Sequence, residues 1–239
     1  MFRARRAPGA AIGLILLLGS VACGSLTAAR TPTPTARPTA RPTPTPTPPP
    51  PDTEAVTVAA TGVGTWQLVT APVAILHNVA TRHGATQVVV HFTAIGSNGA
   101  PLEALDSVAV DLPPNATLPV TADCTDACNN AASATASVTV GKWVESNGIS
   151  FLSSGTAYQC SGCSGHTNGN VSATLTSSIP LGGNTAVAIF AYCSDAAGGI
   201  VGGGASQLVW PGGTSTTVNV SVIVNTAPAS CAVGASTGW

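Results

Sequence analysis

Regular alternation of valine with small polar residues is the feature that most limits how this chain can fold. In TVNVSVIV, residues 217–224, every second residue is valine. QVVVHFTA, residues 87–94, has the same period and places Val88, Val90 and Phe92 on one face. A period of two puts neighbouring side chains on opposite faces of an extended strand. Both segments are therefore predicted to be β-strands with one buried face.

The same pattern continues between turn signals such as GSNGAP, LPPN and PGG, and no helical period accompanies it. Further strands are predicted at 55–60, 63–70, 73–79, 107–111, 117–122, 135–144, 149–158, 170–177, 185–193 and 205–210. Many short strands at this spacing indicate an all-β fold, built as an antiparallel sandwich or barrel.

A faint internal repeat bears on the number of domains. VGTW at 63–66 returns as VGKW at 140–143, and an offset of 98 residues aligns Phe92 with Phe190. We interpret these matches as two related β units, 53–131 and 132–239, the second with an insertion around YQCSGCSGHTNGN. Chance alignment of sequences rich in Val, Gly and Thr is the alternative.

The N-terminus has the form of an export signal. Arginines precede the apolar run AAIGLILLL, and small residues follow up to Ala22. This apolar run is shorter than the roughly 20 residues that span a bilayer, so residues 1–22 are predicted to be a signal peptide. Cys23 then becomes a lipid attachment site that anchors the protein to a membrane. Ordinary cleavage is the alternative, because Ser20 stands where a bacterial lipobox typically has Leu.

A proline-rich spacer follows, within a linker that covers residues 23–52. Residues 31–51 contain ten prolines. Proline fixes the backbone angle φ and lacks an amide donor, so the spacer is predicted to be extended and solvated, with a reach of roughly 65 Å. A glycosylated stalk and a ligand for a proline-recognising domain are the alternatives.

Charge excludes one class of partner. From Asp52 onward the chain has two basic residues, Arg82 and Lys142, and nine acidic ones, a formal charge of −7. Such a surface has little with which to neutralise phosphates, so no nucleic-acid partner is expected.

Six cysteines remain once Cys23 is assigned to the lipid, and an even number suits disulfides in an exported protein. Six cysteines allow 15 connectivities, and we choose one of them by pairing neighbours in the sequence first and the remaining two cysteines by elimination. The predicted disulfide residues are Cys124 with Cys128, Cys160 with Cys163, and Cys193 with Cys231. A redox pair at Cys160 and Cys163 is the alternative function, although no predicted helix follows to stabilise a thiolate. Zinc ligation involving His166, and calcium binding by Asp123, Asp126 and Asn129, are weaker alternatives.

The second unit carries a resemblance to a known family. AIFAYCSDAAGGIV, residues 188–201, and WPGGTSTTVNVSV, residues 210–222, resemble the FxLYD-type and related immunoglobulin-like domains of bacterial lipoproteins. Phe190 fits the motif, and Phe92 is its counterpart in the first unit. The resemblance implies two small immunoglobulin-like β-sandwiches in an envelope protein, and it implies no catalytic residues.

No nucleophile, metal or phosphate motif stands out, because the four histidines are scattered and the glycines of GGIVGGGAS lack a phosphate-loop ending. Those glycines are expected to give strand-turn flexibility. Glu103 and Asp106 are placed on a solvated turn. Trp66, Trp143 and Trp210 are expected to pack in cores, with a carbohydrate surface as the alternative. We therefore expect a non-enzymatic, membrane-anchored envelope protein without a cofactor, which binds or scaffolds another envelope protein or a carbohydrate.

Overall fold

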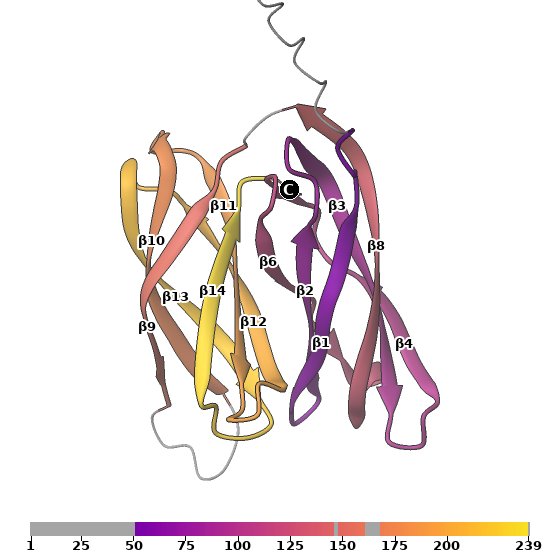
Figure 1. The fold of residues 1–239 in the computed structure, drawn as a ribbon. Coiled ribbons are helices and arrows are strands. Elements are labelled where there is room, and N and C mark those ends of the chain that lie inside the picture. Colours follow the sequence, from indigo (N-terminus) through magenta and orange to yellow (C-terminus); the bar gives the residue numbers. More distant parts are fainter. Residues whose placement is uncertain (1–50, 146–147, 161–167, 239) are drawn as a thin grey trace, which may run out of the picture. The chain divides into compact units, whose positions relative to one another are not determined.

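The structure, a computed structural model, describes residues 51–145, 148–160 and 168–238. Its regular structure is antiparallel β, as the alternating pattern predicts (Figure 1). The strands are β1 (Val56–Trp66), β2 (Val69–Asn78), β3 (His83–Gly96), β4 (Pro101–Asp106), β5 (Val110–Leu112), β6 (Thr117–Thr121), β7 (Cys124–Thr125), β8 (Ala131–Glu145), β9 (Phe151–Gln159), β10 (Asn168–Leu181), β11 (Ala186–Ser194), β12 (Ile200–Val209), β13 (Gly213–Val224) and β14 (Ser230–Ser236). One 3₁₀ turn, η1 (Asp126–Cys128), follows β7. The signal peptide, Cys23 and residues 31–50 of the spacer lie outside the described residues.

The predicted strand faces are confirmed. Val88, Val90 and Phe92 of β3 are buried, and so are the four valines of β13. Three strands were not predicted, β4, β7 and β14. PLEALD and SCAVGAS do not alternate in hydrophobicity, and β7 has only two residues. The predicted strand 55–60 and the first part of the predicted strand 63–70 form one long strand, β1. A turn at Gln67 with φ of 54° separates it from Val69 and Thr70, which begin β2.

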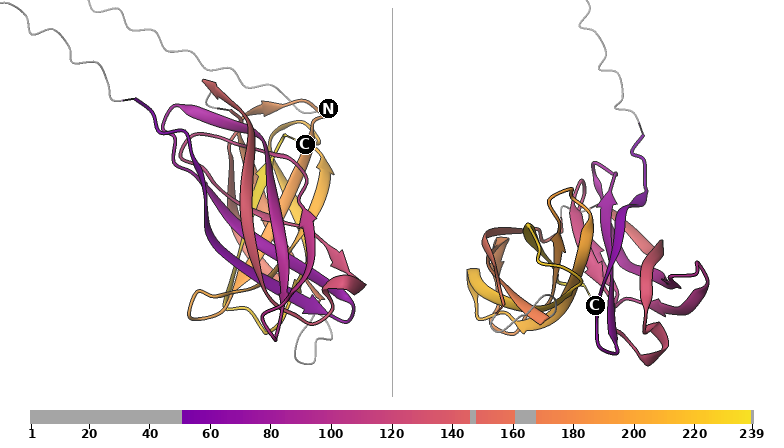
Figure 2. Two further views of the ribbon diagram at one scale, coloured as in Figure 1. Left: turned by 90° about the vertical axis from the view of Figure 1, so that its right-hand side faces the viewer. Right: turned by 90° about the horizontal axis from the view of Figure 1, so that it is seen from below.

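Hydrogen bonding arranges the strands in three sheets. One sheet has the order β1-β2-β6 with β7 beside β2, and a second has the order β4-β3-β5 with β8 beside β3. These two sheets face each other across a core that contains Leu76, Phe92 and Val120. The third sheet has the order β14-β11-β12-β13-β10-β9. Its strands curve around a core of their own, which contains Ile189, Trp210 and Val220 (Figure 2).

The strand pairings occur twice, shifted by the 98 residues that the sequence repeat suggests. In the first half β2 lies between β1 and β6, and β3 lies between β4 and β8. In the second half β10 lies between β9 and β13, and β11 lies between β12 and β14. We call β1–β8 the first sandwich. We call β9–β14 the second sandwich, although a short pairing of β12 with β13 joins its strands into one curved sheet.

The expected unit boundary at residue 132 needs correction. It falls inside β8, which pairs with β3 from His83↔Glu145 to Gly96↔Ala131 and so belongs to the first sandwich. The boundary lies instead between β8 and β9. The shift of 98 residues also relates β1 to β9 and β2 to β10 without an insertion. VGTW and VGKW are therefore not equivalent, because Trp66 ends β1 whereas Trp143 lies on β8.

Strand β11 contributes to both cores, which explains its nearly unbroken apolar sequence. Val187, Ile189 and Ala191 point into the core of the second sandwich. Ala188 and Phe190 point the other way and join the core of the first sandwich. A strand that is buried on both faces needs no polar face. The two sandwiches therefore share a strand that neither core can lose without exposing apolar surface.

Glycines let the strands of the two sandwiches approach closely. A Cβ atom at Gly64 of β1 would collide with the carbonyl oxygen of Ile223 on β13, and one at Gly203 of β12 would lie 2.8 Å from Val73 Cγ2 on β2. The glycines of GGIVGGGAS were expected to give strand-turn flexibility. Gly202, Gly203 and Gly204 are instead buried in β12, where a side chain would meet neighbouring backbone.

The last residue of the linker is fastened to the first sandwich. Asp52 accepts hydrogen bonds on Oδ1 from the backbone N and the Oγ1 of Thr81, both at 2.8 Å. Its Oδ2 accepts from the backbone N of Arg82 at 3.0 Å and of His83 at 3.1 Å. The His83 ring atom Nδ1 lies 3.0 Å from the same oxygen. The hydrogen bond from the Thr81 backbone is the main reason that the pKa of Asp52 lies well below its usual range.

Replacing Asp52 by asparagine is expected to lower the thermal unfolding midpoint at pH 7, because an amide cannot accept hydrogen bonds at both ends. A carboxyl whose pKa is lowered by folding stabilises the native state above its ordinary pKa, and this stabilisation fades as pH falls toward the folded-state pKa. The difference between wild type and Asp52→Asn should therefore narrow below about pH 4. Glu103→Gln is the control, because the Glu103 side chain is exposed on β4, away from Asp52. A difference that stays constant with pH would contradict this role for the carboxylate.

Candidate functional site

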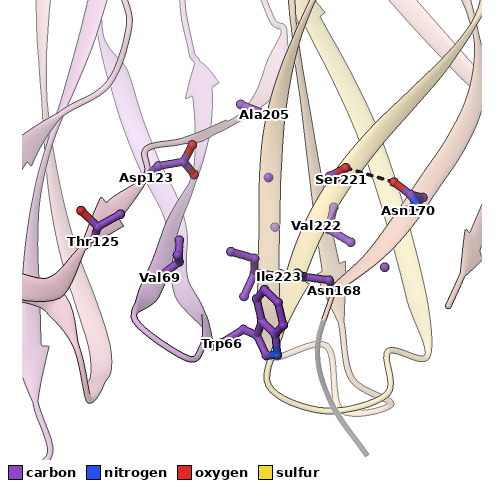
Figure 3. Close-up of a pocket in the computed structure, with 13 residues that line it drawn as sticks. Trp66, Val69, Asp123, Thr125, Asn168, Asn170, Ala205, Ser221, Val222 and Ile223 are labelled. Carbon is purple, nitrogen blue, oxygen red and sulfur yellow. Dashed lines mark hydrogen bonds between the residues drawn. The ribbon is translucent and has the colours of Figure 1, made fainter. Parts of the chain in front are cut away.

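A cleft of about 430 Å³ opens where β1, β2 and β7 of the first sandwich meet β10, β12 and β13 of the second. It is lined by Trp66, Val69, Asp123, Thr125, Asn168, Gly169, Asn170, Gly203, Gly204, Ala205, Ser221, Val222 and Ile223. Figure 3 shows Asp123 and Thr125 on one wall, Ser221 and Asn170 on the other, and the indole of Trp66 between them. We call this the Trp66 cleft.

Trp66 is the aromatic group of the cleft. It is the last residue of β1, directly before the turn at Gln67, and it is half-buried. The expectation that it packs in a core is wrong, because the end of β1 reaches past the core residues. Trp210, by contrast, is fully buried and donates from Nε1 to the Gly213 carbonyl at 3.0 Å, as expected of a core tryptophan. Trp143 is half-buried against the first core.

Uncharged polar groups dominate the rest of the lining. Ser221 Oγ donates a hydrogen bond to Asn170 Oδ1 at 3.1 Å, across the pair that these residues form between β13 and β10. Asp123 is the single charged side chain among the lining residues, and it is exposed, like Thr125. The cleft thus offers one aromatic face, one carboxylate and several neutral donors and acceptors.

Asn225 fixes the end of β1 that carries Trp66. Its Oδ1 accepts from the Thr65 backbone N and from Thr65 Oγ1, both at 2.7 Å. Its Nδ2 donates to the Val63 carbonyl at 2.8 Å. Asn225 directly follows β13. Its side-chain amide therefore makes hydrogen bonds to the β1 backbone like those that a neighbouring strand would make, and so joins the second sandwich to the end of β1.

Asn225→Ala is expected to lower the free energy of unfolding by about 1–3 kcal/mol, because it leaves partly buried backbone groups of β1 without partners. Chemical denaturation followed by circular dichroism measures the change. Asn219→Ala is the matched control, since Asn219 is exposed on β13. Equal losses in the two variants would show that the amide does not hold β1.

Two of the three predicted disulfides join residues that the structure describes, and both are confirmed. Cys124 is bonded to Cys128 across η1. Cys193 is bonded to Cys231, its register partner between β11 and β14, with Cα atoms 4.0 Å apart. Cys160 is also disulfide-bonded, whereas Cys163 and His166 lie outside the described residues. Disulfides of this kind form in oxidising compartments outside the cytosol.

The three residues predicted as possible calcium ligands lie near the Cys124–Cys128 disulfide. Asp123 lines the Trp66 cleft, while Asp126 begins η1 and Asn129 follows it. Among the residues that the structure describes, no group of three or more His, Cys, Asp or Glu side chains is placed to hold a metal ion.

One row of polar side chains crosses the outer face of the β4-β3-β8 sheet. His91 Nδ1 lies 2.6 Å from Asp106 Oδ1, and His91 Nε2 lies 2.8 Å from Thr139 Oγ1. An acid, an imidazole and a hydroxyl in this order can activate a nucleophile. Here the His91 and Asp106 side chains are 42% and 63% exposed, so water competes for these hydrogen bonds. We assign the row to cross-strand pairing, with Asp106 on β4 and not on the predicted turn.

Comparison with known proteins identifies no family for this chain. No protein-family model matches it, and no curated protein matches it. Among solved structures, a red sea bream transglutaminase is similar at 11% identity and a TM-score of 0.22. The match covers 78% of this chain and 29% of the transglutaminase, so the chain spans less than a third of that protein. A likeness this weak carries no argument about fold or function.

Proposed function

We propose that this chain is a non-enzymatic binding protein of the cell envelope, which uses the Trp66 cleft to hold its ligand. The cleft carries the proposal: one aromatic face and several hydroxyl and amide groups converge on about 430 Å³. Ligand sites typically combine an apolar surface with a few placed polar groups in a volume of this order. The glycines beside the cleft support the same role, because they let β1, β12 and β13 form its walls from closely packed backbone.

We further propose that the protein is exported and lipid-anchored at Cys23, on the outer face of the cytoplasmic membrane or at the cell surface. The disulfides Cys124–Cys128 and Cys193–Cys231 support export, and the leader sequence supports the anchor. The spacer would then hold the sandwiches away from the membrane. Anchoring is tested by the intact mass of the mature N-terminus. A diacylglyceryl group on Cys23 is expected, and an unmodified cysteine or a start elsewhere would leave a secreted protein.

Binding is tested with isolated cell envelopes of the organism that makes the protein. The mature chain with Cys23→Ser, which cannot carry the lipid, should sediment with them, whereas the same chain with Trp66→Ala added should remain in the supernatant. Trp143→Ala is the control, because it removes a half-buried tryptophan of the first sandwich and leaves the cleft intact. Equal sedimentation of the Cys23→Ser chain with and without Trp66→Ala would reject the cleft as the binding surface.

A further inference from the structure

The Trp66 cleft continues onto an uncharged face of the second sandwich. The outward side chains of β10 and β13 lie opposite one another in pairs: Asn170↔Ser221, Ser172↔Asn219, Thr174↔Thr217 and Thr176↔Ser215. All eight side chains are exposed or half-buried. Between them, Val171, Ala173, Leu175, Val218 and Val220 belong to the core. We call these eight residues the neutral face.

The neutral face ends at the cleft, because its first pair, Asn170 and Ser221, also lines the cleft. The pairs repeat along the strands about every 6.7 Å, and the two strands lie about 4.8 Å apart. Hydroxyl and amide groups are therefore spread at regular intervals over a surface that starts beside Trp66.

The chemistry of this combined surface matches a neutral polymer with many hydroxyl groups. Each of the eight side chains can both donate and accept a hydrogen bond without carrying charge. An anionic ligand would meet no Lys or Arg among the residues of the cleft and the neutral face, and would meet the carboxylate of Asp123 instead. An apolar peptide would cover these polar groups without satisfying their hydrogen bonds, at a cost in free energy.

A sugar ring also has one apolar face, and the indole of Trp66 offers a surface on which that face can stack. The C–H groups on one side of a pyranose ring are weakly positive, and the face of an indole ring is negative, so the two attract when they stack. Asp123 lies on the wall opposite Asn170 and Ser221, and its exposed carboxylate can accept hydrogen bonds from sugar hydroxyls.

From this geometry we infer that the ligand of the Trp66 cleft is a neutral polysaccharide chain, with one sugar stacked on Trp66 and the following sugars lying along the neutral face. The inference rests on the proposed function, because it names the ligand class of the same site. Asp123, Asn170 and Ser221 bind the hydroxyl groups of the sugar at the cleft, and Asn225 acts as a positioning residue for Trp66.

Sedimentation with envelopes treated by protease or by periodate tests the polysaccharide assignment separately from the proposed function. Sedimentation of the mature Cys23→Ser chain, which carries no lipid, should survive protease digestion of the envelopes and be lost after periodate oxidation, which cleaves vicinal diols of sugars. Sedimentation lost to protease and spared by periodate would keep the cleft as a binding surface and overturn the polysaccharide assignment. No sedimentation with untreated envelopes would overturn the proposed function itself.

Calorimetric titration with defined sugars tests the residues. The probes are hexasaccharides of β-1,4-glucose, β-1,4-N-acetylglucosamine, β-1,4-mannose, β-1,4-xylose and α-1,4-glucose. At least one should bind the wild type, and Trp66→Ala and Asp123→Asn should each weaken it about tenfold, the equivalent of about 1.4 kcal/mol. Trp143→Ala should bind as the wild type does. Binding should not weaken as salt is added, because the ligand is uncharged. Absence of binding to all five probes, or equal binding by Trp66→Ala, would overturn the inference.

Discussion

Phe190→Ala is expected to lower the free energy of unfolding by about 3–5 kcal/mol, the usual cost of truncating a buried aromatic side chain. Phe190 is 1% exposed, and its ring lies in the core of the first sandwich although its strand belongs to the second. Removing the ring would therefore leave a cavity where the two sandwiches share apolar contacts. Guanidinium denaturation, followed by tryptophan fluorescence and by circular dichroism, measures the loss.

Val209→Ala is the matched control for this experiment. Val209 lies on β12, the strand that pairs with β11, and is 63% exposed, so its truncation should change stability by less than about 0.5 kcal/mol. A similarly small loss for Phe190→Ala would mean that the ring is not packed in the shared core.

Removing the Cys193–Cys231 disulfide by a double replacement with alanine should cost about 4 kcal/mol. The chain-entropy relation gives this value for two cysteines 38 residues apart, because the bond restricts a long loop of the unfolded chain. The same relation gives about 2 kcal/mol for Cys124 and Cys128, which are four residues apart. Denaturation under non-reducing conditions compares the two double variants. A larger loss for the Cys124 and Cys128 variant would contradict the loop-length argument.

Strand faces could be predicted because a period of two is a local property of the sequence. The valines of β13 and the apolar residues of β3 are buried as that period requires. Strand β14 could not be predicted in this way, because its small residues become a strand through pairing with β11, far away in the sequence. The alternation in β11 was concealed for a related reason, since each of its faces meets a different core.

The candidate site was only partly within reach of the sequence. Trp66 could be singled out as a tryptophan, but its position at a strand end does not separate it from Trp210, which directly follows β12 and is fully buried. Asn170 and Ser221 are brought together by the pairing of β10 with β13, and only the docking of the two sandwiches adds Asp123 to them. The close approach of the two sandwiches depends on glycines, and the sequence alone does not show which backbone atoms those glycines contact.

The fastening of Asp52 has a mechanical consequence. Strand β1 starts four residues later and pairs antiparallel with β2 from Val56↔Asn78 onward, so a pull on the chain before Asp52 would otherwise peel β1 away one residue pair at a time. The carboxylate is held by Thr81, Arg82 and His83, at the turn that leads into β3, and its hydrogen bonds must break together before peeling can begin. Tension that arrives through the spacer is thus carried first by the β2–β3 turn, and the strand that bears Trp66 is shielded from load.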